Sequence, residues 1–99
     1  MKIIILGAGR VGQSVAESLV SERNDITVID TDAHRLRELE THLDLRGVVG
    51  NGIDPAVLAE AGAKDTDLLI ACAAQDETNL VCCKVAQLLF GIPARIARV

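Results

Sequence analysis

The stretch KIIILGAGRVG, at positions 2–12, decides the fold of this 99-residue chain. It opens with an aliphatic run of the kind that forms a buried strand, and its three glycines match the pattern G-x-G-x-x-G. We expect Gly7 to permit a tight turn, Gly9 to let a pyrophosphate approach the bare backbone, and Gly12 to let a helix pack closely on the strand. Because a helix N-terminus attracts anions, the stretch predicts a phosphate-binding turn, with a plain strand-to-helix turn as the alternative.

A second aliphatic run ends in Asp30, at the spacing of about 20 residues expected after such a turn. The Asp30 carboxylate would accept hydrogen bonds from the adenosine ribose hydroxyls, and its charge would repel the 2′-phosphate of NADP, which favours NAD. Alternatively, Asp30 or Asp32 caps the helix that begins near Ala33, and both roles can coexist with Asp32 as the cap. Arg10 could reach the pyrophosphate or simply lie exposed on the first helical turn.

Short runs rich in β-branched residues recur along the whole chain and predict buried parallel strands. These runs are Lys2–Leu6, Ile26–Asp30, Gly47–Val49, Leu68–Ala73 and Arg95–Val99. Apolar residues with helical spacing lie between them, so strand and helix alternate. The pattern predicts an α/β fold of Rossmann type, a doubly wound parallel sheet of five strands in the order 3-2-1-4-5.

Capping residues mark where the predicted helices begin and end. Asp54, followed by a proline, can open the third helix, and Gly62 can close it. We expect Asp76 to cap the fourth helix and Gly91 to end it in a left-handed conformation. The apolar stripe of that helix should serve the core and in part a subunit interface. It comprises Val81, Val85, Leu88 and Leu89.

Composition favours one small domain, since 49% of the residues are hydrophobic and can form a single aliphatic core. A net charge of −4 and a single aromatic residue, Phe90, argue against a nucleic-acid partner, because phosphates would be repelled and bases would lack stacking platforms. The apolar run after Met1 is too short for a signal peptide or a membrane span, which favours the cytosol. The cysteines lack disulfide or metal spacing and should pack as small hydrophobes: Cys72, Cys82 and Cys83.

No arrangement of side chains predicts catalysis or a metal site. His34 and His42 lie on the same predicted helix, about 12 Å apart by helical rise, which is too far for a metal or acid–base pair. Four acidic residues are better explained as loop and cap residues than as a catalytic pair: Asp65, Asp67, Asp76 and Glu77. The alternative is a cofactor-binding fragment of an NAD-dependent oxidoreductase, whose substrate residues would lie in a second domain.

Six short motifs follow one another along essentially the whole chain. They are the glycine-rich turn, NDITVID at 24–30, VVGNG at 48–52, AGA at 61–63, DETN at 76–79 and RIAR at 95–98. Together they resemble the TrkA family, the peripheral cytoplasmic subunits of bacterial Trk potassium uptake systems. The DETN motif is far more specific than the glycine pattern. The resemblance implies one N-terminal nucleotide-binding domain of the RCK or KTN type, called TrkA-N, over residues 1–99.

The resemblance also implies roles for particular residues. The turn from Gly7 to Val11 would hold the pyrophosphate, Asp30 the ribose, and Asn51 would lie near the adenine end. The Ala73–Ala74 pair would line the ligand, and Arg98 would supply a charged contact. Some relatives carry hydroxyl residues in place of the alanine pair and Asp or His in place of Asn51, so polar contacts there would come from the backbone. The expected cofactor-binding residues are Gly7, Ala8, Gly9, Arg10, Val11, Gly12, Asp30, Asn51, Ala73, Ala74 and Arg98.

The resemblance further implies a regulatory role without chemistry. NAD or NADH would act as an effector, with ATP or ADP as alternative ligands, and the partner would be an integral-membrane Trk potassium transporter subunit. The protein would be a homo-oligomer, cytoplasmic and peripheral at the inner face of the membrane. The chain ends on its expected fifth strand with no helix to cover that end of the sheet, so we expect a domain truncated at its C-terminal end. The related domain of potassium efflux systems is a further alternative, against which Met1 at the first strand argues.

Overall fold

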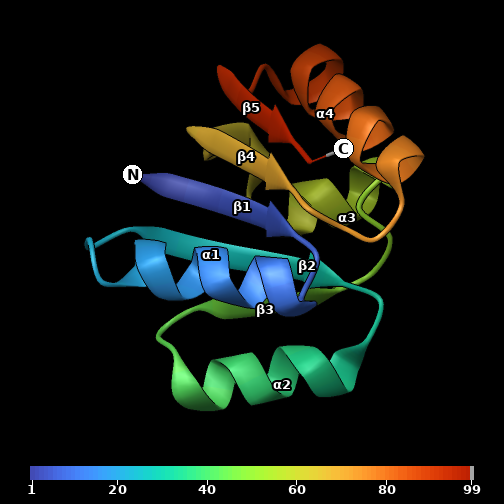
Figure 1. Ribbon diagram of the computed structural model, residues 1–99. Coiled ribbons are helices and arrows are strands. Elements are labelled where there is room, and N and C mark those ends of the chain that lie inside the picture. Colours follow the sequence, from blue (N-terminus) through green and yellow to red (C-terminus); the bar gives the residue numbers. More distant parts are fainter. Residues whose placement is uncertain (99) are drawn as a thin grey trace.

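The computed structural model describes residues 1–98, which form one parallel sheet in the order β3-β2-β1-β4-β5. All five arrows point the same way in Figure 1, as the alternation of aliphatic runs and helical stripes predicts. The strands are β1 (Lys2–Leu6), β2 (Asp25–Asp30), β3 (Arg46–Val49), β4 (Leu68–Ala71) and β5 (Ala94–Ala97). The central strand β1 pairs with both neighbours, so that Leu6 lies opposite Ile29 on one side and Ala71 on the other.

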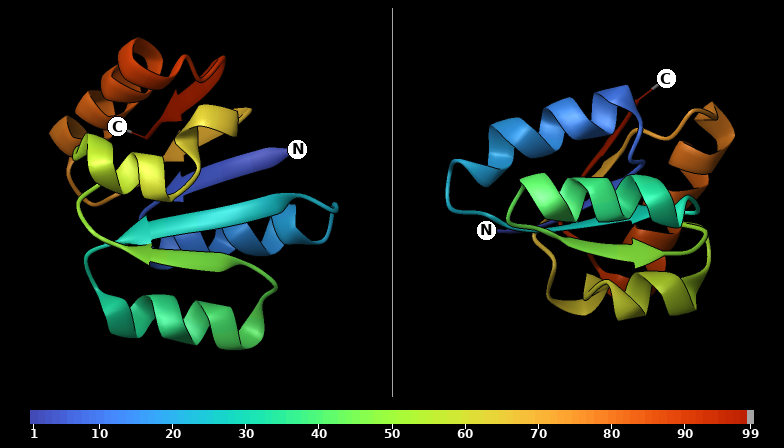
Figure 2. Two further views of the ribbon diagram at one scale, coloured as in Figure 1. Left: turned by 180° about the vertical axis from the view of Figure 1, so that it is seen from behind. Right: turned by 90° about the horizontal axis from the view of Figure 1, so that it is seen from below.

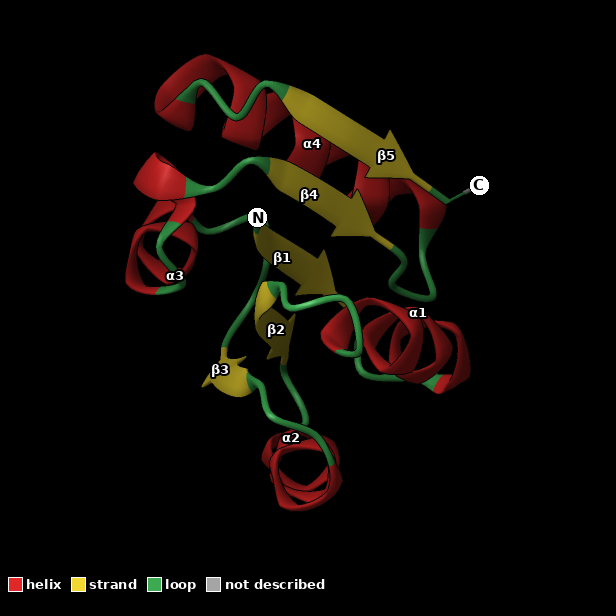
Figure 3. Ribbon diagram, turned by 90° about the vertical axis from the view of Figure 1, so that its left-hand side faces the viewer, coloured by secondary structure: helices red, strands yellow, loops and turns green. Residues whose placement is uncertain are grey.

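Helices cover both faces of the sheet, which confirms the doubly wound arrangement. The helical segments are α1 (Arg10–Val20), α2 (Ala33–His42), α3 (Pro55–Glu60), the short 3-10 turn η1 (Ala63–Asp65) and α4 (Asp76–Phe90). Figures 2 and 3 show α1 and α2 on one side of the strands and α3 and α4 on the other. Two aliphatic clusters result, one around Ile3 and Ile5 beneath α1 and α2, the other around Ile4 and Leu69 beneath α3 and α4.

The predicted caps are correct at three of the helix ends and wrong at one. Asp54 accepts a hydrogen bond from the Ala56 N–H, and both Gly62 (φ 87°) and Gly91 (φ 63°) take the left-handed conformation. Asp76, by contrast, is the first residue of α4 and not its cap. The extended Gln75 takes the cap position, because its carbonyl accepts the first helical hydrogen bond, from the Asn79 N–H at 3.2 Å.

The apolar stripe of α4 was expected to serve the core and in part a subunit interface, and the core part is wrong for three of its four residues. Val81, Leu88 and Leu89 are 46%, 68% and 61% exposed, and only Val85 packs against the core. The buried face carries smaller or polar side chains: Asn79, Cys82 and Ala86. Both sets have helical spacing, and the small side chains of the second set let α4 lie directly on β4 and β5.

Two predicted strands end earlier than expected. Cys72 still donates to the Leu6 carbonyl, but β4 ends at Ala71 because Ala73 turns away to hydrogen bond with the side chain of Asn79. β5 ends at Ala97, so Arg98 follows the strand, and only the predicted end at Val99 lies outside the described residues. Ile96 lies on the face of the sheet opposite α4 and is 56% exposed, because no helix within residues 1–98 covers that face of β5.

The cysteines pack as hydrophobic residues, as predicted for two of the three. Cys72 and Cys82 are buried, each in one of the two aliphatic clusters, whereas Cys83 is half-buried. Burial raises the pKa of all three thiols, and that of Cys82 reaches about 12 with a smaller contribution from the neighbouring Cys83. Over residues 1–98, no helix combines the length and apolarity needed to traverse a bilayer.

Candidate functional site

A cleft of about 740 Å³ opens at the carboxyl ends of β1, β2 and β4. This is the edge of the sheet where loops from both of its halves meet, the usual ligand position in an open parallel sheet. All but two of the expected site residues line the cleft: Gly7, Gly9, Arg10, Val11, Asp30, Asn51, Ala73, Ala74 and Arg98. The exceptions, Ala8 and Gly12, are buried beneath the turn. The structure therefore brings residues from five separate segments of the chain together in one place.

The three glycines of the turn differ in what surrounds them. Gly7 has a φ of +110°, and a Cβ there would lie 2.9 Å from the Cys72 carbonyl oxygen. A Cβ on Gly12 would overlap the carbonyl oxygen of Gly7. Gly9 faces open space, where the one described atom that an added Cβ would meet is Nη1 of Arg35, at 3.9 Å. Two glycines thus shape the turn, and the third leaves the backbone open at the N-terminus of α1.

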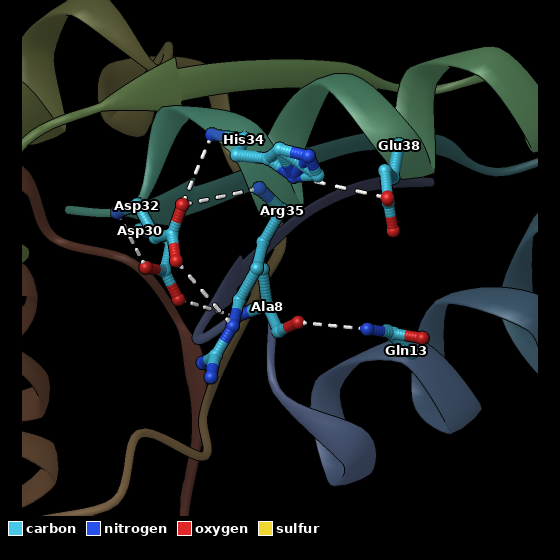
Figure 4. A network of polar contacts seen from close by, with 7 residues as sticks. All are labelled: Ala8, Gln13, Asp30, Asp32, His34, Arg35 and Glu38. Atoms are coloured by element: carbon cyan, nitrogen blue, oxygen red, sulfur yellow. Dashed lines mark hydrogen bonds and ion pairs between the residues drawn. The ribbon is translucent and has the colours of Figure 1, made fainter.

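The Asp30 carboxylate ties the end of β2 to the glycine-rich turn. Its Oδ2 accepts a hydrogen bond from the Ala8 N–H at 2.7 Å, and its Oδ1 accepts one from the Asp32 N–H at 2.8 Å (Figure 4). Asp32 in turn caps α2 by accepting from the N–H groups of His34 and Arg35. Asp32 is therefore the cap of α2, and the ribose role of Asp30 stays a prediction. Each Asp30 oxygen retains a lone pair, so the carboxylate can still accept from a ligand hydroxyl.

Positive charge gathers in the cleft although the chain as a whole carries −4. Arg10, Arg35 and Arg98 all line it, and Asp30 is the one acidic residue among the described residues that line it. Such a site favours an anionic ligand. Arg35 was not predicted from the sequence, where an arginine on an exposed helical turn resembles any solvated residue. Its position three residues after the helix cap is the signal that could have identified it.

A buried amide connects the loops after β4 and β5. The Asn79 Oδ1 accepts from the Ala73 N–H at 2.8 Å, and its Nδ2 donates to the carbonyls of Ala73 and Arg98, both at 3.0 Å. Asn79 is fully buried, and no buried side-chain polar atom in residues 1–98 is left without a partner. The sequence indicated Asn79 only as part of a motif. The structure assigns it the positioning of two segments that line the cleft.

The polar groups expected beside the ligand are partly occupied within the protein. Asn51 Oδ1 accepts from the Ile53 N–H at 3.1 Å, and the Ala73 N–H is bonded to Asn79. The Ala73 N–H is therefore not free to supply the backbone contact that was expected in place of a hydroxyl side chain. Gln75 and Thr78, which were not predicted, also line the cleft and bring polar side chains to it.

The histidines and most of the acidic residues lie away from the cleft. His34 is exposed on α2, 3.7 Å from a Glu38 oxygen, and His42 is exposed at the end of the same helix. Asp67 is a loop residue just before β4, and its carboxylate accepts from the Lys2 N–H, at the amino end of β1, at 2.8 Å. Among residues 1–98, no three His, Cys, Asp or Glu side chains gather in a way that could hold a metal ion.

Sequence comparison finds relatives over the full chain. Residues 3–99 match the family described as the TrkA-N domain. The chain is 60% identical over 99 residues to the Trk system potassium uptake protein TrkA of Halomonas elongata and 57% identical to that of Vibrio alginolyticus. The whole chain is covered in both cases, but only 22% of each relative, so the chain spans about a fifth of their length.

Solved structures share the fold across proteins of different activity. The Kef C-terminal domain of Shewanella denitrificans, in its AMP-bound form, has a TM-score of 0.82 and 23% identity over 97% of this chain and 57% of that one. ChuY, an anaerobilin reductase of Escherichia coli O157:H7, has a TM-score of 0.74 and 20% identity over 96% of this chain and 48% of that one. At these identities the likeness concerns the fold, and function has to be argued from the site.

Proposed function

This chain belongs to the TrkA-N domain family, and from that premise we propose that it is the nucleotide-binding domain of a regulatory protein of potassium uptake. We propose NAD or NADH as the ligand, with ATP or ADP as the alternative. The observation that carries this proposal is the open backbone at Gly9, which faces a cleft lined by three arginines and one carboxylate.

The cleft fits an adenine nucleotide in the chemistry of its groups. The N–H groups at the start of α1 would hold a phosphate or pyrophosphate, and a side chain at Gly9 would fill the space that the phosphate needs. Asp30 would accept from the ribose hydroxyls, and Asn51 would lie near the adenine. The Ala73–Ala74 pair would line the ligand, and Arg10 and Arg98 would add charged contacts.

Regulation requires the ligand to bind two states of the protein with different affinity. NAD and NADH differ in charge and planarity at the nicotinamide. The segment from Ala73 to Asp76, of which residues 73–75 line the cleft, would sense this difference. Asn79 bonds that segment to the carbonyl of Arg98 and lies on α4, so a shift of the segment would be passed to α4 and β5. The receiver would be an integral-membrane potassium transporter subunit. The protein would act as a homo-oligomer, in the cytoplasm at the inner face of the membrane.

The competing function is that of an oxidoreductase fragment, because the same fold and turn serve hydride-transfer enzymes. The names of the relatives, all of which belong to potassium uptake, favour regulation without chemistry. Steady oxidation of NADH with a small substrate would favour the enzyme instead.

We predict that Gly9→Val abolishes the response to nucleotide while leaving the protein folded. The branched side chain would occupy the open face of the turn and keep the phosphate from the backbone, weakening NADH binding by roughly 30-fold or more. Titration calorimetry with NADH, NAD, ATP, ADP and NADP measures binding. Potassium flux through the reconstituted membrane partner, with each nucleotide, measures regulation.

Circular dichroism melts of the Gly9→Val protein provide the control for folding. Unchanged NADH affinity in a folded variant would rule out the turn as the site. Identical flux with every nucleotide in the unaltered protein would contradict the regulatory function.

A second prediction concerns the choice between NAD and NADP. Asp30→Asn removes the charge that opposes a 2′-phosphate, so NADH affinity should fall by about tenfold while NADP gains relative to NAD. The asparagine can keep only one of the two backbone hydrogen bonds, so a stability loss of about 1 kcal/mol should accompany the change.

Asp25→Asn is the matched control, because it removes an exposed charge at the opposite end of the same strand, away from the cleft. The NAD to NADP preference should stay within a factor of two in that variant. Equal affinities for NADP and NADH in the unaltered protein would contradict the role of Asp30.

A further inference from the structure

We propose that Arg35 binds the 5′-phosphate of the adenine nucleotide and makes the site select a nucleotide over its nucleoside. This inference rests on the proposed function, because it concerns the same cleft. Arg35 lies on the first turn of α2 and was absent from the residues expected to bind the cofactor. Among residues 1–98 it is nevertheless the one side chain within 4 Å of where a Cβ on Gly9 would stand, with Nη1 at 3.9 Å.

The Arg35 side chain extends out of its own helix toward the phosphate turn. Figure 4 shows it running from α2 toward Ala8, between the Asp30 and Asp32 carboxylates and the start of α1. Asp32 Oδ2 lies 3.5 Å from Nε of Arg35, and the other Asp32 oxygen caps the backbone of the same turn. One carboxylate therefore fixes both the start of α2 and the near edge of the guanidinium.

The far edge of this guanidinium is available to a ligand. Asp32 contacts Arg35 at Nε, and the Arg35 side chain is 57% exposed and lines the cleft. A guanidinium edge presents parallel N–H donors that match two oxygens of a phosphate. The N–H groups at the start of α1 approach the cleft from the other side of the turn. A phosphate at Gly9 would thus be held by a helix N-terminus and by an arginine from a different helix.

The carboxylates determine which phosphate Arg35 can serve. Asp30 lies where the ribose hydroxyls would be bound, so a phosphate on the 2′-oxygen would stand next to its negative charge. A phosphate on the 5′-oxygen would continue away from Asp30 toward Gly9, where Nη1 of Arg35 lies. The inference is therefore specific for a 5′-phosphate, as in AMP, ADP, ATP and NAD, and excludes a 2′-phosphate.

The test compares adenosine, 5′-AMP and 2′-AMP by titration against the unaltered protein and three variants. Arg35→Gln should weaken 5′-AMP binding by about tenfold, because the side chain is 57% exposed and solvent screens the charge. Adenosine affinity should stay within a factor of two, because adenosine has no phosphate for Arg35 to contact. Arg35→Lys keeps the charge without the paired donors, so its 5′-AMP affinity should lie between those of the unaltered protein and Arg35→Gln.

Arg37→Gln is the matched control, because Arg37 is exposed on the same helix and does not line the cleft. It should leave all three affinities unchanged. Equal weakening of adenosine and 5′-AMP by Arg35→Gln, or no weakening of 5′-AMP, would overturn the inference while leaving the nucleotide site intact. A 2′-AMP affinity that depends on Arg35 more than that of 5′-AMP would overturn it as well. Absence of all binding to the unaltered protein would instead overturn the proposed function, and the inference with it.

Discussion

Replacing Gly12 with alanine is expected to lower the free energy of unfolding by about 3–5 kcal/mol. The new methyl group would overlap the carbonyl oxygen of Gly7, which is backbone and cannot rotate aside as a side chain could. Gly7 is itself fixed, because its N–H donates to the Ile29 carbonyl at 2.8 Å. Urea denaturation followed by circular dichroism measures the change.

The sign of the change in unfolding free energy distinguishes an effect of packing from an effect of helix propensity. Inside an exposed helix, glycine to alanine stabilises by about 1 kcal/mol, so propensity alone predicts the opposite result. Gly9→Ala is the matched control in the same turn, because its Cβ meets open space and its φ of −75° suits any residue. Its stability should stay within about 1 kcal/mol of the original. A Gly12→Ala protein as stable as the original would contradict the close approach of α1 to the turn.

The sequence was sufficient to predict the strand order and the shape of the turn. Both follow from local rules: parallel buried strands are continuously aliphatic, crossovers are right-handed, and a glycine-rich turn between strand and helix has few conformations available. Gly7 and Gly12 could be understood in this way because backbone contacts alone define their roles. The capping of α2 by Asp32 was likewise among the alternatives that the sequence left open.

The sequence was insufficient wherever two residues of the same type differ only in their surroundings. Arg35 and Arg37 are both exposed arginines on α2, and only the reach of the first over the phosphate turn distinguishes them. Likewise, α4 carries two stripes with helical spacing, and hydrophobicity favoured the stripe that includes Leu88 over the one that contains Asn79. The choice depends on how near α4 lies to the sheet, which is a tertiary property that no local pattern records.

Asn79→Ala is expected to lower the free energy of unfolding by about 3 kcal/mol, because three hydrogen bonds are lost inside the protein. The Ala73 N–H would be left without its partner, and a cavity would open where the amide was. Such a buried donor typically costs about 1–3 kcal/mol by itself. Gln87→Ala, at an exposed position of the same helix, is the control and should stay within about 0.5 kcal/mol.

The same substitution should also weaken nucleotide binding at temperatures where the variant remains folded. Asn79 does not line the cleft, so any effect on binding has to pass through the two segments that it holds, around Ala73 and Arg98. We expect NADH affinity to fall by about tenfold, because part of the binding free energy would be used to order both segments. Calorimetric titration about 10–15 °C below the variant's own melting temperature, where the variant is still folded, measures this affinity. If the variant loses the predicted stability but binds NADH with unchanged affinity, Asn79 serves the fold alone and does not position the segments that line the cleft.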